Sequence, residues 1–132
     1  MKSEPGEFSI DDLAARPSKT EPWDGVRNYQ ARNFMRQMQV SDQGFFYHSL
    51  KEKSVVGIVE VISAAHPDST TDDPRWDCVD IKAVQSVPQP VTLAQIKECK
   101  DLQNMVLVKN SRLSVQPVTP HEWRTICKMA GV

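Results

Sequence analysis

The sequence of 132 residues lacks any hydrophobic run long enough to span a membrane, and it lacks a leader of charged and then apolar residues. It also lacks an excess of either charge, since 16 basic residues stand against 17 acidic ones. The first absence excludes a membrane-spanning helix. The second excludes a surface coated with basic residues but leaves room for a local basic site. We therefore expect no membrane partner, with a cytoplasmic location in a bacterium or a nuclear one in a eukaryote.

Cysteine is scarce, because the chain has only three, widely spaced and without a CxxC pair. An odd number of isolated cysteines is typical of reduced thiols inside a cell. We interpret Cys78, Cys99 and Cys127 as buried thiols rather than nucleophiles. The histidines also lack the paired spacing of metal ligands, so we expect neither a metal ion nor a cofactor.

Four motifs of catalysis and nucleotide binding are absent as well: the nucleophile elbow, HExxH, the Walker loop and the dinucleotide fingerprint. His48 and Ser49 are adjacent, but neighbours in a strand point to opposite faces, which is poor geometry for a Ser–His pair. We interpret His121 as a solvated surface residue and His66, ahead of Pro67, as structural. An enzyme that uses His48 stays an alternative without a supporting motif.

Three segments share the signature of a capped helix start: FSIDDL (8–13), VTLAQI (91–96) and VTPHEW (118–123). Each has an apolar residue, a Ser or Thr, an acid or amide three positions later and a second apolar residue. The signature predicts helices near 10–16, 93–99 and 120–130. Pro17 stops the first helix, and Gly131 can end the last.

A fourth helix is predicted over 29–38, with Asn28 as its cap, because apolar residues recur there at helical spacing. Strands are predicted over 44–50, 55–65, 76–87 and 112–118. The segment 66–74, with two prolines and three acids, is predicted to be one exposed loop. Short strands mixed with short helices indicate one α+β domain over 1–132, built on a small and strongly curved sheet or barrel.

The stretch WDGVRNYQARNF (23–34) combines aromatic rings, amides and guanidinium groups at the start of a helix. Trp23 and Tyr29 could stack on a flat ring, a contact that contributes about 1–3 kcal/mol per base. Asn28 or Gln30 could pair with a base edge, and arginines could meet phosphates. The alternatives are a core position for Trp23 and a solvated helix face for the arginines.

Two predicted strands could supply further walls of a binding site. In RLSVQPV (112–118) one face carries Arg112, Ser114 and Gln116, which would line either a concavity or a solvent-facing edge. In FFYHS (45–49) Phe46 and His48 point one way, and the remaining side chains point the other way. We expect one face of FFYHS to be core and the other to suit a flat ligand with polar edges.

Seven segments together resemble the EVE domain, a family with a PUA-like fold that includes thymocyte nuclear proteins. They follow the family's order and cover nearly the whole chain. The segments are MKSEP (1–5), FSIDDL (8–13), WDGVRNYQARNFMR (23–36), FFYHS (45–49), VGIVEV (56–61), PRWDCVDI (74–81) and RLSVQPVT (112–119). The resemblance implies a bent β-barrel with helices packed around it. It also implies a kinship with readers of modified bases, including the YTH readers of methylated adenine in RNA.

The same resemblance implies that the chain binds nucleic acid at a modified base, with modified cytosine in DNA preferred over an RNA base. The base would be flipped into a pocket, which must offset an unstacking cost of a few kcal/mol. The pocket positions that the resemblance assigns are Lys2, Ser3, Trp23, Arg27, Asn28, Tyr29, Tyr47, His48, Ser49, Arg112, Ser114 and Gln116.

Roles can be assigned to these positions by residue type. Trp23 and Tyr47 would stack on the base, whereas Ser3, Asn28 and Ser49 would contact its polar edges. The arginines among them, at positions 27 and 112, would hold phosphate or tie the barrel internally.

Two departures from the family accompany the resemblance. Relatives carry residues ahead of MKSEP that form a first strand, so we expect that strand to be short here. The stretch between 66–68 and 74–76 is also short, and it could contribute to nucleic-acid contact or cover the pocket. An enzyme or a small-molecule or protein-binding module that uses the same pocket remains the alternative to a reader.

Overall fold

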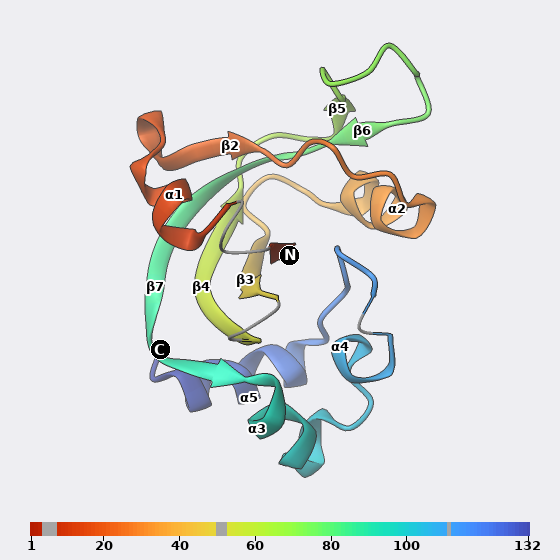
Figure 1. Cartoon of the computed structure of the whole chain (residues 1–132). Helices are drawn as coiled ribbons and strands as arrows, with labels where there is room; N and C mark the ends of the chain where they lie inside the picture. The colour runs from red at the N-terminus through yellow and green to blue at the C-terminus, as the bar shows by residue number, and fades with distance from the viewer. Residues whose placement is uncertain (4–7, 50–52, 111) are drawn as a thin grey trace.

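The computed structural model describes residues 1–3, 8–49, 53–110 and 112–132. Its main element is a five-stranded sheet in the order β1-β3-β4-β7-β2. Its strands are β1 Lys2–Ser3, β2 Thr20–Pro22, β3 Gln43–His48, β4 Ser54–Val61 and β7 Asp80–Thr92. Neighbouring strands run antiparallel except for β1, which is parallel to β3. Figure 1 shows β4 and β7 bending together, so that the sheet curls into a half-barrel.

A two-stranded ribbon and several short helices surround this sheet. The ribbon pairs β5 His66–Pro67 with β6 Asp77–Cys78. The helices are α1 Ile10–Ala15, α2 Tyr29–Gln37, α3 Leu93–Glu98, α4 Val106–Lys109 and α5 Pro120–Ala130, with 3-10 turns η1 Pro17–Lys19 and η3 Lys100–Leu102. Figure 1 places α1 and α2 at one end of the curled sheet and α3, α4 and α5 at the other. Within the described ranges, no helix combines the length and the apolar character needed to cross a membrane.

The four predicted helices are confirmed, and their caps explain where they begin. Ser9, Thr92 and Thr119 each accept a hydrogen bond from the backbone N–H three residues on, and each capping box closes reciprocally. The Asn28 side chain accepts from the Ala31 N–H at 2.9 Å. At the last C-terminus Gly131 adopts φ 82°, a left-handed conformation that glycine tolerates well.

The bend of the sheet arises where the ladders shift register. The β4–β7 pairing shifts between Val55 and Gly57, and the partner residues in β7 jump there from Val91 to Ser86. Pro88 and Pro90 lie in the interval, where their missing N–H groups cost no ladder hydrogen bond. Bulges of this kind increase the local twist and bend, which lets the sheet curl.

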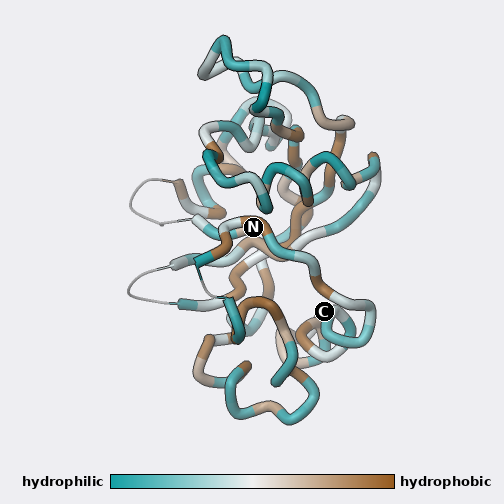
Figure 2. The backbone as a smooth tube through the Cα atoms, turned by 90° about the vertical axis from the view of Figure 1, so that its right-hand side faces the viewer, coloured by the Kyte–Doolittle hydropathy of each residue, from teal (hydrophilic) through white to brown (hydrophobic). Residues whose placement is uncertain are grey.

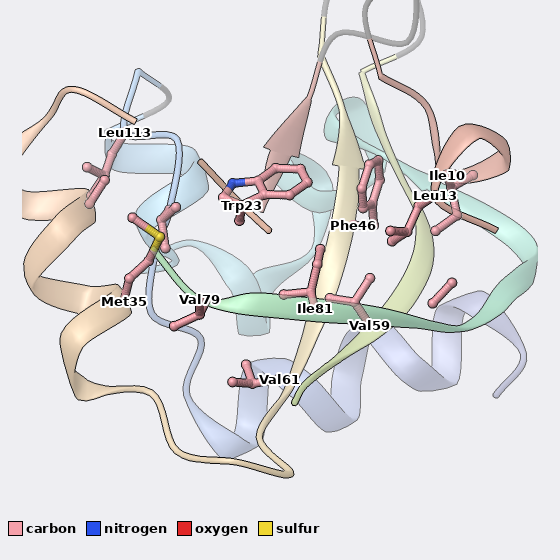
Figure 3. Packing of buried hydrophobic residues seen from close by; sticks show 13 residues of the cluster. Ile10, Leu13, Trp23, Met35, Phe46, Val59, Val61, Val79, Ile81 and Leu113 are labelled. Atoms are coloured by element: carbon pink, nitrogen blue, oxygen red, sulfur yellow. The ribbon is translucent and has the colours of Figure 1, made fainter. Parts of the chain in front are cut away.

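Two hydrophobic cores lie on opposite faces of the curled sheet. The first core contains Trp23 and Phe46 together with side chains from α1 and α2 (Figure 3). The second contains Phe45 and Tyr47, together with Ile96 of α3 and other residues of η3, α4 and α5. Phe45 and Tyr47, on the face that was expected to suit a flat ligand, are nearly buried against the C-terminal helices.

The prediction of a strand over 112–118 is wrong. The segment forms a turn and bends instead. The Gln116 amide donates to the carbonyls of Asn110 and Leu113, at 3.0 and 2.7 Å, so a side chain takes acceptors that a partner strand would use. Pro117 has no N–H to donate. The predicted alternation survives in part, because Leu113 and Val115 are buried in the first core.

The other strand predictions hold with changed boundaries. The predicted 76–87 strand divides into β6 and β7, and β7 continues beyond residue 87. Residue 50, the predicted end of the 44–50 strand, lies outside the described residues. Val79, Ile81 and Ala83, which alternate along this segment, all have buried side chains.

Candidate nucleic-acid interface

The parallel pairing of β1 with β3 brings the first group of predicted site residues together. Lys2 lies opposite Tyr47, and Ser3 lies opposite His48. The pairing continues beyond β3, because the Ser49 N–H donates to the Ser3 carbonyl at 2.8 Å. On its other side, β1 is joined to the 112–118 segment, since the Lys2 N–H donates to the carbonyl of Ser114 at 3.0 Å. Six predicted positions, Ser114 among them, thus meet at one end of the sheet.

Trp23 lies in the first core, as the core alternative proposed. Its ring packs edge-on against Phe46 and Phe8, at centroid distances of 5.5 and 6.2 Å, and the residue is 9% exposed. The indole N–H has no hydrogen-bond partner among the described residues. Every side-chain nitrogen or oxygen that is fully buried in this part of the chain does have a hydrogen-bond partner, so the indole nitrogen is not fully buried. This donor therefore keeps some contact with solvent.

His48 lies beside Phe46, whose ring Trp23 also contacts. Its ring contacts Phe46 edge-on at 5.7 Å, and its Nε2 accepts a hydrogen bond from the Ile10 N–H at 3.1 Å. A neutral imidazole that accepts at Nε2 carries its proton on Nδ1. The Nε2 lone pair is engaged in this arrangement, so it holds α1 on the sheet rather than facing a ligand as a base.

Tyr47 lies on the opposite face of β3, against the second core. It is 4% exposed, and burial raises the pKa of its hydroxyl. The Lys2 ammonium lies 5.7 Å from the ring centroid, and the pKa of Lys2 is lowered by burial and then by the charge of Lys53. Trp23 and Tyr47, the two predicted stackers, therefore do not face each other across a single pocket.

A cavity of about 630 Å³ lies along β3 and is lined mainly by apolar side chains. The predicted site residues that reach it are Lys2, Tyr47 and Gln116. Gln116 uses its amide N–H groups on the chain's own carbonyls, as described above. Arg112 is exposed and makes no ion pair with a described carboxylate.

Arg27 lies elsewhere, where it ties the 23–28 segment to the segment between β5 and β6. Its Nη1 is 3.0 Å from Asp68 Oδ2, its Nη2 donates to the Thr70 hydroxyl at 2.8 Å, and its guanidinium lies 5.5 Å from the Trp76 ring centroid. This is the internal tie that the sequence left as an alternative. Asn28 is likewise used as the cap of α2.

Asp68 corrects the prediction that 66–74 is one exposed loop. The residue is 2% exposed, and its carboxylate accepts from the Gly25 N–H at 2.9 Å, as well as from Arg27 and Thr70. Burial alone would raise the pKa of Asp68, but these hydrogen bonds outweigh burial and hold the pKa well below its usual range. The loop is thus anchored to the 23–28 segment at its base, while its outer part is mostly hydrophilic (Figure 2).

Tyr29 belongs to a second surface that the sequence did not predict. Its ring stacks on Trp76 with centroids 5.0 Å apart and planes inclined by 26°. Arg75 Nη1 donates to the Tyr29 hydroxyl at 3.3 Å, and the Arg32 guanidinium lies 4.8 Å from the Tyr29 ring centroid. We call Tyr29, Arg32, Arg75 and Trp76 the Tyr29–Trp76 surface. The tryptophan between Pro74 and Asp77 was the available signal for it.

The base of the β5–β6 ribbon is held by a histidine–carboxylate pair. His66 Nε2 lies 2.9 Å from Asp80 Oδ1, and this hydrogen bond is the main reason that the pKa of His66 is raised above 6.5. Behind it, burial raises the pKa of the Cys78 thiol to about 11, so this cysteine stays protonated, as expected of an unreactive thiol.

We expect His66 to titrate above pH 6.5 and the Asp80→Asn variant to move its pKa back toward that value. A raised histidine pKa means that the pair's contribution to stability is present below about pH 6.5 and is lost as the pH rises through the folded-state value. A two-dimensional NMR titration of the imidazole C–H signals measures the pKa of His66 in the wild type and in the Asp80→Asn variant. A His66 pKa at or below 6.5, or one that Asp80→Asn leaves unchanged, would contradict the assignment.

The fold is a curled five-stranded sheet with helices packed at both ends and with polar groups beside strand β1. This architecture defines a PUA-like domain of the α+β class, as predicted. Comparison with protein-family models matches the EVE domain over residues 1–129, and the chain belongs to this family. Thymocyte nuclear protein 1 of Homo sapiens is 39% identical over 155 aligned residues, which cover 93% of this chain and 69% of the relative.

Solved structures match the fold along nearly the full length. A crystal structure of a protein from Agrobacterium tumefaciens has a TM-score of 0.96 and 53% identity, and the match covers 99% of this chain and 90% of that one. The human THYN1 protein, solved in complex with DNA containing 5-methylcytosine, has a TM-score of 0.94 and 36% identity, with coverage of 100% and 96%.

Proposed function

We propose that this chain is a non-catalytic DNA-binding domain that recognises a modified cytosine, flipped out of the duplex. The observation that carries the proposal is the match over the whole chain to the human THYN1 protein in complex with DNA containing 5-methylcytosine. We further propose that residues 1–132 act as one domain, located where it meets DNA: the cytoplasm of a bacterium or the nucleus of a eukaryote.

The base pocket in this proposal lies where β1, β3 and the Trp23 segment meet. Trp23 offers a solvent-reached indole N–H and an aromatic edge, which suit a planar base with polar atoms at its rim. Ser3 and Ser49 come from the paired backbone of β1 and β3. The Ser3 hydroxyl donates to the Phe8 carbonyl at 2.5 Å, so in this proposal it accepts a hydrogen bond from the base, whereas Ser49 supplies its hydroxyl group. His48 acts as a positioning residue, because it fixes α1 against the same strand.

The other predicted residues act around this pocket. Lys2 and Tyr47 hold β1 against the sheet, while Arg27 and Asn28 fix the segment that follows Trp23. Arg112, which is exposed beside Ser114, would meet a phosphate group. Ser114 and Gln116 shape the wall next to β1 through their backbone and side-chain hydrogen bonds.

We expect the protein to bind a duplex with one 5-methylcytosine about fourfold more tightly than the matched cytosine duplex, because burying one methyl group contributes about 0.8 kcal/mol. Fluorescence anisotropy at fixed salt, with further duplexes carrying 5-hydroxymethylcytosine or N6-methyladenine, measures the preference. Equal affinity for all four duplexes would contradict the proposal, and recovery of a chemically altered base would instead support an enzyme.

Ser49→Ala provides a variant for the same assay. It should reduce the preference among the bases, whereas Ser86→Ala, on an exposed position of β7, should leave the preference unchanged. If the two serine variants have equal effects, Ser49 is not part of the pocket, but the proposed preference for a modified cytosine still stands.

A further inference from the structure

The Tyr29–Trp76 surface has the composition of a nucleic-acid contact but lies apart from the proposed base pocket. Tyr29 is 50% exposed although Trp76 stacks on one face of its ring and the Arg32 guanidinium lies 4.8 Å from the ring centroid, so part of the ring is open to solvent. Arg32 and Arg75 flank the Tyr29 ring, on which arginine can gain a cation–π contact. An exposed aromatic ring between two guanidinium groups can contact both the sugars and the phosphates of a DNA strand.

Arg32 differs from the neighbouring arginines in having an uncompensated charge. Arg27, Arg36 and Arg75 pair with Asp68, Asp77 and Asp73, respectively. Arg32 instead donates to the Asn33 side chain and to the Arg75 carbonyl, and it pairs with no carboxylate of the described residues. Its positive charge is therefore available to a phosphate, which can accept from the second N–H group of Nη1 and of Nη2, since these bonds use only one N–H of each.

The surface is held rigidly with respect to Trp23. The Trp23 backbone N–H donates to the Val79 carbonyl at 2.8 Å, and Asp68 ties Gly25 and Arg27 to the loop that carries Trp76. Only a short stretch of chain separates Trp23 from Tyr29, and both of its ends are fixed by these bonds. A DNA strand with a base at Trp23 would therefore meet the Tyr29–Trp76 surface at a defined distance along its backbone.

We propose that the Tyr29–Trp76 surface binds the sugar–phosphate backbone of the DNA beside the flipped nucleotide, with Arg32 on a phosphate and the Tyr29 ring against the adjacent sugar. This inference rests on the proposed function for its partner, DNA, but not on the identity of the modified base. Backbone contacts carry no sequence information, so the surface contributes affinity in common to modified and unmodified duplexes.

The test is the Arg32→Gln variant in titrations of two duplexes that differ by one methyl group, each at several salt concentrations. We expect the affinity for both to fall by the same factor, roughly three- to tenfold at low salt, with the slope of log affinity against log salt reduced by about 1. The ratio of the two affinities should stay at the wild-type value. Tyr29→Ala should also weaken both duplexes equally, but with the salt slope unchanged.

Arg124→Gln is the matched control, because Arg124 is exposed on α5 at the other end of the molecule and loses the same charge (Figure 1). An Arg32→Gln variant that binds like Arg124→Gln would overturn the proposal, and so would a change confined to the ratio of affinities. Arg32→Lys, which keeps the charge, should retain the salt slope. If the wild-type protein binds the two duplexes equally while Arg32→Gln still lowers the affinity for both, the proposed recognition of modified cytosine is wrong. The proposal that the Tyr29–Trp76 surface binds the DNA backbone would still hold.

Discussion

Replacing Trp23 with alanine is expected to lower the free energy of unfolding by about 3–5 kcal/mol, the usual cost of removing a large aromatic side chain from a core. The ring is 9% exposed and packs edge-on against Phe8 and Phe46, so its removal leaves a cavity beneath β1 and β3. Urea denaturation followed by circular dichroism measures the loss. A loss below about 0.5 kcal/mol, the range of surface substitutions, would contradict the core position.

Trp23→Phe separates the structural role of Trp23 from its role in binding. Phenylalanine keeps an aromatic ring in the core but removes the indole N–H, so the preference for 5-methylcytosine over N6-methyladenine, whose polar edge differs, should fall while the fold persists. Trp123→Phe is the matched control, since Trp123 stacks on Phe45 in the second core at 4.1 Å. If both variants keep the preference of the wild type, Trp23 is a core residue only.

The Asp68→Ala substitution is expected to lower the free energy of unfolding by about 2–4 kcal/mol. This is less than the cost of breaking a fully buried ion pair, because the Arg27 end of the pair is partly exposed. The carboxylate accepts hydrogen bonds from Gly25, Arg27 and Thr70, and alanine leaves all of these donors without their acceptor. Thermal and urea unfolding measure the effect. Asp72→Ala, an exposed acid of the same loop, is the control and should change stability by less than about 0.5 kcal/mol.

The same carboxylate makes stability depend on acid pH. Because the folded-state pKa of Asp68 is lowered, its contribution is present above the unfolded value of about 3.9 and is lost as the pH falls through the folded-state value. Asp68→Asn should therefore flatten the acid side of the stability curve, which urea titrations between pH 2 and 6 can follow, in roughly the range where carboxylates protonate. An unchanged acid limb would contradict the anchoring role.

The helices could be predicted from the sequence because their signals are local. Each capping box lies within four consecutive residues, and the structure closes all three. The 112–118 segment alternates like a strand, but whether it pairs depends on distant partners. Gln116 takes two carbonyl acceptors, and Pro117 offers no donor. The alternation of apolar and polar residues predicted the burial of Leu113 and Val115 correctly, but it wrongly predicted that the segment pairs with a neighbouring strand.

The candidate site could be predicted only in part, for the same reason. The density of rings and guanidinium groups in 23–34 indicated a binding segment, but not that its residues divide between a core and a surface. Tyr29 meets Trp76, which is far away in the sequence, and Arg27 meets Asp68 in a loop whose acids suggested solvent exposure. Such pairings depend on how β5 and β6 return the chain to α2, and a single sequence does not contain that information.

Strands β4 and β7 run through both hydrophobic cores, and this should make the unfolding of the domain cooperative. β4 contributes Val55 to the second core and Val61 to the first, and β7 contributes Val91 and Ile81 in the same way. Neither core can be lost without unpairing the same two strands, so heat should melt both ends in one transition. A ligand at either end would then slow amide exchange at the other, because both share one opening reaction.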